Sequence, residues 1–364
     1  MLRQTIPKLP RHLLKSATHF GSDFQSTQTP FQDNSHKRQS RRITTMAAPD
    51  VASLLRSLDK WDQAWAKHDP NELQKLLAPD CTLHADGVLF ENDLKGADAI
   101  LDIHKRYFST FDFNHEPIAC AANPETRSGF AFWQDHDVRR KEGDKGAGTS
   151  IAGMWKAVFN QDCSAIQDIY FLRQLHQEEA EHKLKDPKSI AKGGVDSSRY
   201  PKAPATMTAT ESEAQKHKEE QKAARYAAEQ YSKIWQTGDT SIAEKIMDEN
   251  VKSTDLMHGG ELQGRQSWCD MIKKVFENWK PTTSSYDVGV SLDGRVALVH
   301  WISEGAESHQ GAEPDQNIKM FGLNMLQINP ENGKIVESIG FRQLSPVERE
   351  MMMKPDAFKR AKEQ

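Results

Sequence analysis

The chain has 364 residues, of which 37% are hydrophobic, and a formal net charge of −4 at pH 7. This length exceeds what one hydrophobic core usually supports, so we expect two domains of roughly 130 residues each. The nearly balanced charge gives no long-range field for an anionic partner, and we expect neither nucleic acid nor a membrane as a partner. No stretch reaches about 18 consecutive apolar residues, so a membrane-spanning helix is not predicted.

Residues 1–48 have the composition of an organelle transit peptide or a disordered leader. Arginine and lysine are scattered among serine, threonine and glutamine, and only Asp23 and Asp33 are acidic. A transit peptide would place the protein in a chloroplast or mitochondrion. The alternative is that Met46 begins the protein, with a cytoplasmic location.

The sequence of the first globular segment predicts helices followed by strands. Apolar residues between Val51 and Trp65 recur with the spacing of an amphipathic helix, and a short second helix ends before Pro79. A strand pair follows around residues 81–90, turned at Asp86-Gly87, and a third helix begins after Gly96. Three or four strands complete the segment, the clearest being residues 129–138, 151–160 and 165–175.

The same order returns further along the chain. Phe171-Leu172-Arg173-Gln174-Leu175 reappears as Phe341-Arg342-Gln343-Leu344, and unlike features match at offsets of 168 to 170 residues. The matched pairs are Trp65 with Trp235, Gly96 with Gly264, Trp133 with Trp301, Gly153 with Gly322 and Arg173 with Arg342. The repeat predicts a domain at residues 49–176, a charged linker at 177–216, a second domain at 217–345 and a charged C-terminal tail at 346–364, with final strands at 295–304, 318–329 and 334–344.

Three phrases of the second copy resemble the nuclear-transport-factor-2-like superfamily, and its SnoaL-like branch in particular. They are Trp235-Gln236-Thr237-Gly238-Asp239, Leu262-Gln263-Gly264-Arg265 and Gly333-Lys334-Ile335-Val336-Glu337; the first copy keeps them less faithfully, as at Trp65-Ala66-Lys67-His68-Asp69. The resemblance implies an α+β fold of two tandem cone-shaped domains, each a strongly bent antiparallel sheet wrapped around helices with a pocket at its open end. Members of the superfamily include cyclases, isomerases, dehydratases and domains without chemistry, so fold alone does not fix function.

Catalytic members usually place one carboxylate or histidine in an apolar pocket, where loss of solvation moves its pKa. Among the ionisable residues of the first copy, which also include His115 and Glu116, we select Asp135, His136, Asp168 and Tyr170 as candidate catalytic residues. Strand alternation puts Trp133 and Asp135 on one face and His136 on the other, and the sequence leaves open which face is inside. The candidate pocket-lining residues are Trp61, Trp65, His84, Trp133, Trp235, Trp301 and Glu337.

Metal and cofactor sites are not predicted. The four cysteines, Cys81, Cys120, Cys163 and Cys269, are isolated and form neither a disulfide framework nor a CxxC knuckle. No paired histidines with a third ligand stand out. We expect neither a metal nor a cofactor.

Three functions remain in order of preference. The first is an acid/base cyclase, isomerase or dehydratase acting on a small, mostly apolar carbonyl compound. The second is a ligand-binding or assembly module without catalysis. The third is a protein similar to iota-class carbonic anhydrases, which use tandem domains of this superfamily; their His-His-Ser-Ser type signature is missing from residues 170–173 and 339–342.

Superfamily members often pair sheet to sheet, and a duplicated chain can make that contact internally. We therefore expect the two copies to pair within the chain, which would then be mostly monomeric.

Overall fold

The computed structural model of the chain describes residues 51–141, 148–188, 193–200, 211–257, 260–307 and 315–357. The leader predicted over residues 1–48 lies outside these ranges, as do parts of the linker and of the C-terminal tail. Within the described ranges, no helix is long and apolar enough to cross a lipid bilayer.

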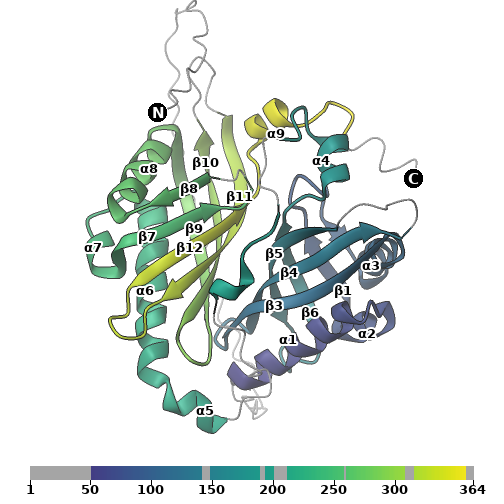
Figure 1. Cartoon of the computed structure of the whole chain (residues 1–364), viewed down its shortest axis with the longest axis horizontal. Coiled ribbons are helices and arrows are strands. Elements are labelled where there is room, and N and C mark those ends of the chain that lie inside the picture. Colours follow the sequence, from purple (N-terminus) through teal and green to yellow (C-terminus); the bar gives the residue numbers. More distant parts are fainter. Residues whose placement is uncertain are drawn as a thin grey trace, which may run out of the picture.

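The first half of the chain folds as two helices, a strand pair, a third helix and four antiparallel strands (Figure 1). Leu54, Leu58 and Trp65 are buried on one face of the first helix, as their amphipathic spacing predicts. Asp69 caps the second helix with its carboxylate. The elements are α1 (Val51–Ala66), α2 (Pro70–Leu76), β1 (Leu77–His84), β2 (Leu94–Lys95), α3 (Ala97–Thr110), β3 (Phe111–Asn123), β4 (Ser128–Arg140), β5 (Thr149–Phe159) and β6 (Ile166–Arg173).

The second half repeats this order. Its elements are α6 (Lys218–Thr237), α7 (Ala243–Ile246), β7 (Met247–Asp255), β8 (Gly260–Gln263), α8 (Arg265–Asn278), β9 (Trp279–Val290), β10 (Val296–Glu307), β11 (Asp315–Ile328) and β12 (Ile335–Arg342). Gly96 and Gly264 precede equivalent helices with φ of 91° and 90°, a conformation that favours glycine and explains why both copies carry one there. The segments outside the repeat are α4 (Gln177–Lys183), the 3₁₀ helix η1 (Ser197–Arg199), α5 (Glu211–Lys216) and α9 (Pro346–Met352).

All strands of the described residues belong to one sheet of 12 strands in the order β2-β1-β6-β5-β4-β3-β9-β10-β11-β12-β7-β8. Each half contributes six consecutive strands, and in each half one parallel pair, β1 with β6 or β7 with β12, closes an otherwise antiparallel arrangement. The long helices α1 and α6 pack on the sheets of their own halves. The predicted fold class is confirmed: the chain is α+β, with two tandem domains that each wrap a strongly bent sheet around helices (Figure 1).

Two contacts between the halves join residues that are each other's counterparts in the repeat. Ala122 of β3 pairs with Val290 of β9, and Leu184 after α4 forms a bridge with Met353 after α9. A contact of one residue with its own counterpart is the mark of a two-fold axis. The two halves are therefore related by an approximate two-fold axis, as the subunits of a symmetric dimer would be.

Each half contributes six strands to the sheet, and the faces of these two six-stranded parts that lie away from α1 and α6 share one apolar core. Its largest members from the first half are Phe130, Phe132 and Met154, and those from the second half include Phe321 and Phe341. Burial of apolar side chains from both sheets in one cluster stabilises the contact of the halves by the hydrophobic effect.

The described part of the linker packs between the halves. The Val195 backbone N–H donates to Gln134 Oε1 at 2.6 Å. Arg199 forms an ion pair of 2.8 Å with Glu337 of β12, and Tyr200 packs edge to face on Phe132. The segment predicted as a plain charged linker thus contributes to the contact of the halves.

The predicted turn at Asp86-Gly87 is wrong in detail. The strand pair exists, but β1 ends at His84 and β2 begins at Leu94, so residues 85–93 form a loop instead of a tight hairpin turn. The reason is the Asp86 side chain, whose Oδ1 accepts hydrogen bonds from three successive backbone N–H groups, those of Val88, Leu89 and Phe90. Such local bonds offer the backbone an alternative to strand pairing.

Candidate functional site

A partly enclosed cavity of about 60 Å³ lies in the first half, between α1, α3 and the inner face of the sheet. Apolar and aromatic side chains form most of its wall, as in typical small-molecule sites. Trp61 and Trp155 lie with ring centroids 5.5 Å apart, and Trp133 stacks on Phe171 at 5.9 Å. The lining residues are Trp61, Asp62, Trp65, Leu83, Leu89, Phe90, Leu94, Ile100, Ile103, His104, Tyr107, His115, Trp133, Trp155, Ile169, Phe171 and Arg173.

Three ionisable residues from three elements meet at the cavity wall. His115 of β3 lies between two carboxylates: its Nδ1 is 2.7 Å from Asp135 Oδ1 on β4, and its Nε2 is 3.5 Å from Asp62 Oδ1 on α1. The three side chains are between 0% and 5% exposed. His115 and Asp62 line the cavity, whereas Asp135 lies behind His115. Donation from Nδ1–H to Asp135 fixes the ring orientation and turns Nε2 toward Asp62.

The strands that carry these residues are irregular close to them. The register of β3 against β4 shifts on both sides of His115, and that of β4 against β5 shifts after Asp135. Asp137 has a φ of 53°, in the left-handed region. Bulges of this kind bend a strand and change the direction of its side chains, and they are common beside active sites.

Burial and charge move the pKa values of two of these groups. Burial opposes protonation of His115, but its hydrogen bonds and charge interactions with Asp135 and Asp62 outweigh that effect and raise its pKa to about 9. Loss of solvation raises the pKa of Asp62, and the nearby His115 only partly opposes this rise. At neutral pH His115 is thus held protonated, while the carboxyl of Asp62 is brought closer to working pH than an exposed aspartate.

Several buried polar atoms at the cavity have no hydrogen-bond partner among the described residues. They are Asp62 Oδ2, Trp65 Nε1 and Tyr107 Oη, and all three residues line the cavity. Buried polar groups without partners are rare, because each costs roughly 1 to 3 kcal/mol. The cavity therefore combines an apolar wall with donors and acceptors that a ligand can satisfy.

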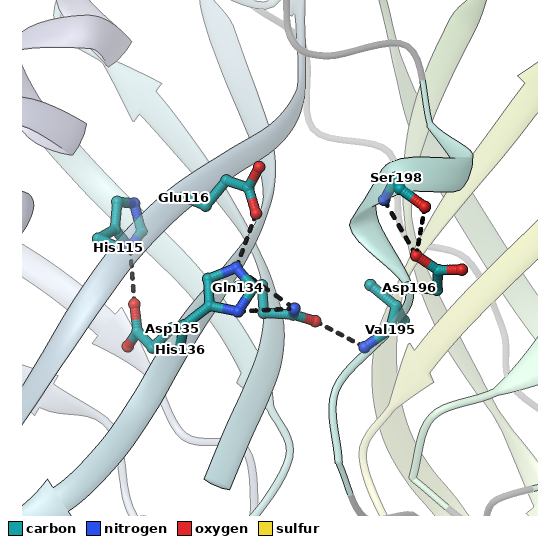
Figure 2. A network of polar contacts seen from close by, with 8 residues as sticks. All are labelled: His115, Glu116, Gln134, Asp135, His136, Val195, Asp196 and Ser198. Atoms are coloured by element: carbon teal, nitrogen blue, oxygen red, sulfur yellow. Dashed lines mark hydrogen bonds and ion pairs between the residues drawn. The ribbon is translucent and has the colours of Figure 1, made fainter. Parts of the chain in front are cut away.

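The structure separates the predicted catalytic residues. Only Asp135 lies next to the cavity, through its contact with His115. His136 points to the opposite face of β4, where its Nε2 lies 2.7 Å from Glu116 Oε2, and both are near the linker (Figure 2). Trp133 and Asp135 thus face the interior of the first half, which decides the question left open by the sequence.

Asp168 and Tyr170 of β6 also lie away from the cavity. Asp168 Oδ1 is 3.1 Å from His84 Nε2, and Tyr170 stacks on the His84 ring at a centroid distance of 4.1 Å. On its other side Tyr170 lies 4.1 Å from the His300 ring of the second half. Tyr170 thus takes part in the contact of the two halves, whereas Asp168 pairs within the first half.

Of the residues predicted to line a pocket, Trp61, Trp65 and Trp133 line the cavity. His84 does not, and Trp235, Trp301 and Glu337 belong to the second half. Trp301 donates its indole N–H to Asn324 Oδ1 at 2.9 Å. Glu337 pairs with the linker, as described above.

Sequence reasoning missed Asp62 and named His115 without selecting it. A signal for Asp62 was present, because it falls four residues after Leu58 and three before Trp65, on the apolar face of α1. An acidic residue in that place must be either buried or at the edge of the face. Tyr107 and Arg173, which also line the cavity, carried no comparable signal.

The second half has lost all three ionisable groups. At the positions of Asp62, His115 and Asp135 it carries Ser232, Ser284 and Ser303, according to the repeat offset and the strand pairing. Ser232 donates to a backbone carbonyl of its own helix, and the hydroxyls of Ser284 and Ser303 lie 3.1 Å apart. Serine hydroxyls that hydrogen-bond to each other or to the backbone have neither the charge nor the pKa for acid/base catalysis near neutral pH.

Polar side chains in the second half replace the apolar wall of the cavity. Tyr231, Asn324 and Ser338 stand where the first half has Trp61, Trp155 and Ile169. The Tyr231 hydroxyl lies 3.1 Å from Ser338 Oγ, and Asn324 Nδ2 donates to it at 3.5 Å. The interior of the second half is thus held by its own hydrogen bonds.

Within the part of the chain that the structure describes, no group of three or more histidine, cysteine, aspartate or glutamate side chains could hold a metal ion.

No protein-family profile matches the chain, and no curated protein matches it. Solved structures are similar at low identity. A steroid delta-isomerase from Pseudomonas aeruginosa is 19% identical, with a TM-score of 0.28 over 35% of this chain and 85% of that chain. A protein with a cystatin-like fold from Methylobium petroleophilum PM1 is 12% identical, with a TM-score of 0.30 over 35% and 80%.

An NTF-2-like protein from Burkholderia xenovorans LB400 is 17% identical, with a TM-score of 0.25 over 34% of this chain and 84% of that chain. Nothing about reaction or ligand follows from such values. The element order and the bent six-stranded sheet of each half agree with the fold that the resemblance to the nuclear-transport-factor-2-like superfamily implies.

Proposed function

We propose that the first half is an acid/base enzyme of the isomerase, dehydratase or cyclase type, acting on a small, mostly apolar carbonyl compound. The observation that carries this proposal is the pair formed by Asp62 and His115, whose buried side chains lie at the wall of an aromatic cavity. Acid/base catalysis needs one group that accepts a proton and one that donates a proton, and different environments of the two groups can give them the pKa values for these roles.

The proposed roles follow from the charge states. Asp62, with its raised pKa, removes a proton from the carbon next to the ligand carbonyl. His115, held protonated by Asp135, donates Nε2–H to the carbonyl oxygen as negative charge develops there. In an unsaturated ligand whose enolate is conjugated to a carbon–carbon double bond, return of the Asp62 proton to the far carbon of that double bond would isomerise the ligand. In a β-hydroxy carbonyl compound, the Asp62 proton would leave with the β-hydroxyl as water, which dehydrates the ligand.

The size of the cavity limits the ligand. A buried water needs roughly 10 to 15 Å³ measured in this way, so a cavity of about 60 Å³ has room for only a few non-hydrogen atoms. A short-chain ketone or aldehyde therefore fits this cavity better than a polycyclic compound.

Proton exchange tests the proposal without knowledge of the natural substrate. Small open-chain ketones such as butanone are incubated with the protein in D₂O, and deuterium at the carbon next to the carbonyl is followed by NMR. We expect exchange above background that Asp62→Asn lowers by at least a hundredfold and His115→Gln by at least tenfold.

His136→Gln is the matched control, because His136 is a histidine of the neighbouring strand that faces away from the cavity. It should leave the exchange rate within a factor of two. If neither ketones nor aldehydes exchange with the parent protein, or if Asp62→Asn exchanges as fast as the parent, the catalytic proposal fails. Ligand binding that survives such a failure would favour the binding-module alternative.

We also propose that the second half is not catalytic, because it carries serines at the three ionisable positions. For the leader we keep the proposal of a transit peptide. Residues 1–48 fused to a fluorescent protein should direct it to chloroplasts or mitochondria, and a uniformly cytoplasmic signal would contradict this.

A further inference from the structure

We infer that the second half forms part of the first half's site, because it holds the loop of residues 85–93 (the wall loop) against the cavity. In this arrangement Gln343 and the apolar residues around Val88 are positioning residues that set the size of ligand the cavity accepts. The effect on catalysis depends on the proposed function. The contacts between the loop and the second half do not depend on it.

The inner side of the wall loop belongs to the cavity. Leu89 and Phe90 line it, next to Leu94 at the start of β2. Hydrogen bonds within the loop link its residues, because the buried Asp86 carboxylate accepts three of its backbone N–H groups at 2.7 to 3.0 Å. A displacement of the loop backbone would therefore displace both lining side chains.

The outer side of the wall loop is held by residues far away in the sequence. Gln343 Nε2, just after β12, donates a hydrogen bond to the Ala85 carbonyl oxygen. Val88 is only 1% exposed, and it packs in a cluster that includes Leu344, Met353 and Met257 of the second half. Removal of the second half would expose this apolar residue and leave the Ala85 carbonyl without this donor.

The first half adds further contacts to the wall loop. Leu175, Ala180 and Leu184 belong to the same apolar cluster. Lys183 Nζ of α4 donates to the Leu89 carbonyl oxygen at 3.4 Å. Since α4 and α9 meet at one end of the molecule (Figure 1), the loop lies under a joint of both halves.

Among the described residues, the arrangement exists on one side of the approximate two-fold axis only. In the second half β7 ends at Asp255 and β8 begins at Gly260, so fewer residues separate these strands than separate β1 from β2. Gln174, the counterpart of Gln343, uses its Oε1 to accept from the Ala152 and Gly194 N–H groups. Its Nε2 has no hydrogen-bond partner among the described residues. The extra loop length and the extra hydrogen bond thus occur together, in the half that has the ionisable site.

The small volume of the cavity means that the contact of the wall loop with the second half limits the size of the ligand. A dry protein cavity of about 150 Å³ accommodates benzene. The cavity here is about 60 Å³, so a ring compound enters only if part of the wall moves outward. The wall loop is the part of the lining held by side-chain contacts to another domain. Loosening those contacts should admit larger ligands and weaken the hold on small ones.

The test compares Gln343→Glu with Gln174→Glu. In Gln343→Glu the side chain can still accept the hydrogen bond from Phe321 N–H that Gln343 Oε1 accepts at 2.8 Å, but it cannot donate to Ala85. Gln174→Glu puts a carboxylate at the equivalent position and loses no donated bond in the described structure. Val88→Ala is a second variant, which removes part of the apolar contact.

Two measurements need no substrate and are made on the full chain. Hydrogen exchange of a peptide covering residues 85–93 should become at least threefold faster in Gln343→Glu and Val88→Ala, with peptides from β4 unchanged. Acrylamide quenching of tryptophan fluorescence should rise at least 1.5-fold, because four of the eight tryptophans line the cavity. Gln174→Glu should match the parent in both measurements.

A third measurement separates positioning from general stability. If the proposed proton exchange is found, Gln343→Glu should raise KM for a small ketone at least fivefold and change kcat by less than a factor of two. The inference is overturned if the peptide covering 85–93 exchanges at the parent's rate in both loop variants, or if Gln174→Glu loosens it equally. Failure of the catalytic proposal leaves the first two measurements intact, so the two failures are distinguishable.

Discussion

Lys156 of β5 and Asp287 of β9 form an ion pair of 2.8 Å between the two halves, and each side chain is 8% exposed. Burial alone would raise the pKa of Asp287, but Lys156 and the hydrogen bonds from Ser128 and Asn123 hold it below its ordinary value. At the positions related by the two-fold axis the chain carries Met325 and Ala119, which are both buried in the shared apolar core. One side of the contact is therefore ionic and the other apolar.

The first prediction concerns this pair. Asp287→Ala should lower the free energy of unfolding by about 3 to 5 kcal/mol, because it leaves the Lys156 ammonium buried without its carboxylate. The double variant Lys156→Met with Asp287→Ala copies the residues of the other side and should recover most of that loss. Chemical denaturation of the two single variants and the double variant measures the coupling. Additive losses in the double variant would show that the ion pair is not a coupled unit.

The second prediction concerns pH. The pKa of His115 is raised from its usual 6.5 to about 9 in the fold. A raised pKa means that the folded state binds the proton more tightly, so the stabilisation is complete below about pH 6.5 and is lost as pH rises through 9. The loss amounts to about 3 kcal/mol at most. Unfolding followed between pH 6 and 10 should show this decline in the parent and a flatter profile in His115→Gln. Equal slopes in both proteins would contradict it.

The third prediction concerns two glycines. A Cβ on Gly153 would come within 2.2 Å of Trp133 Cζ2, and one on Gly322 within 2.2 Å of Trp301 Cζ2. Each tryptophan lies flat across the glycine paired with it on the next strand. Gly153→Ala and Gly322→Ala should each cost about 1 to 3 kcal/mol, since the indole must move in a close-packed interior.

Gly260→Ala is the control for both glycine variants, because nothing lies within 4 Å of a Cβ at that position. Its thermal unfolding should match the parent. Only Gly153→Ala should also alter acrylamide quenching in the first half, because Trp133 lines the cavity and Trp301 does not.

The fourth prediction concerns the pairing of the halves. Co-expressed fragments of residues 51–200 and 211–357 should copurify as one complex of one copy each, because the shared apolar core would be exposed in either fragment alone. The intact chain should be a monomer in light scattering at all concentrations. Fragments that elute separately, or an intact chain that forms a concentration-independent dimer, would be evidence against internal pairing.

The sequence by itself determined the duplication and the order of elements. Amphipathic spacing in residues 51–65 and the paired glycines Gly96 and Gly264 report local backbone and burial requirements, which each copy must satisfy separately. Such patterns can be recognised in the sequence without knowing which other helices and strands pack against them. Together with the resemblance to the nuclear-transport-factor-2-like superfamily they predicted the fold class, and the helix spacing also placed Trp61 and Trp65 on a buried face.

Only the tertiary structure decided the site. Strand alternation defines two faces of β4 but cannot say which one is covered by α1, so Asp135 and His136 were equal candidates in the sequence. The contact of His115 with Asp62 joins β3 to α1 across 53 positions of the chain, and that of Gln343 with Ala85 joins the two halves across 258. Contacts of that range depend on how bent sheets and helices pack together, and no local pattern of residues encodes them.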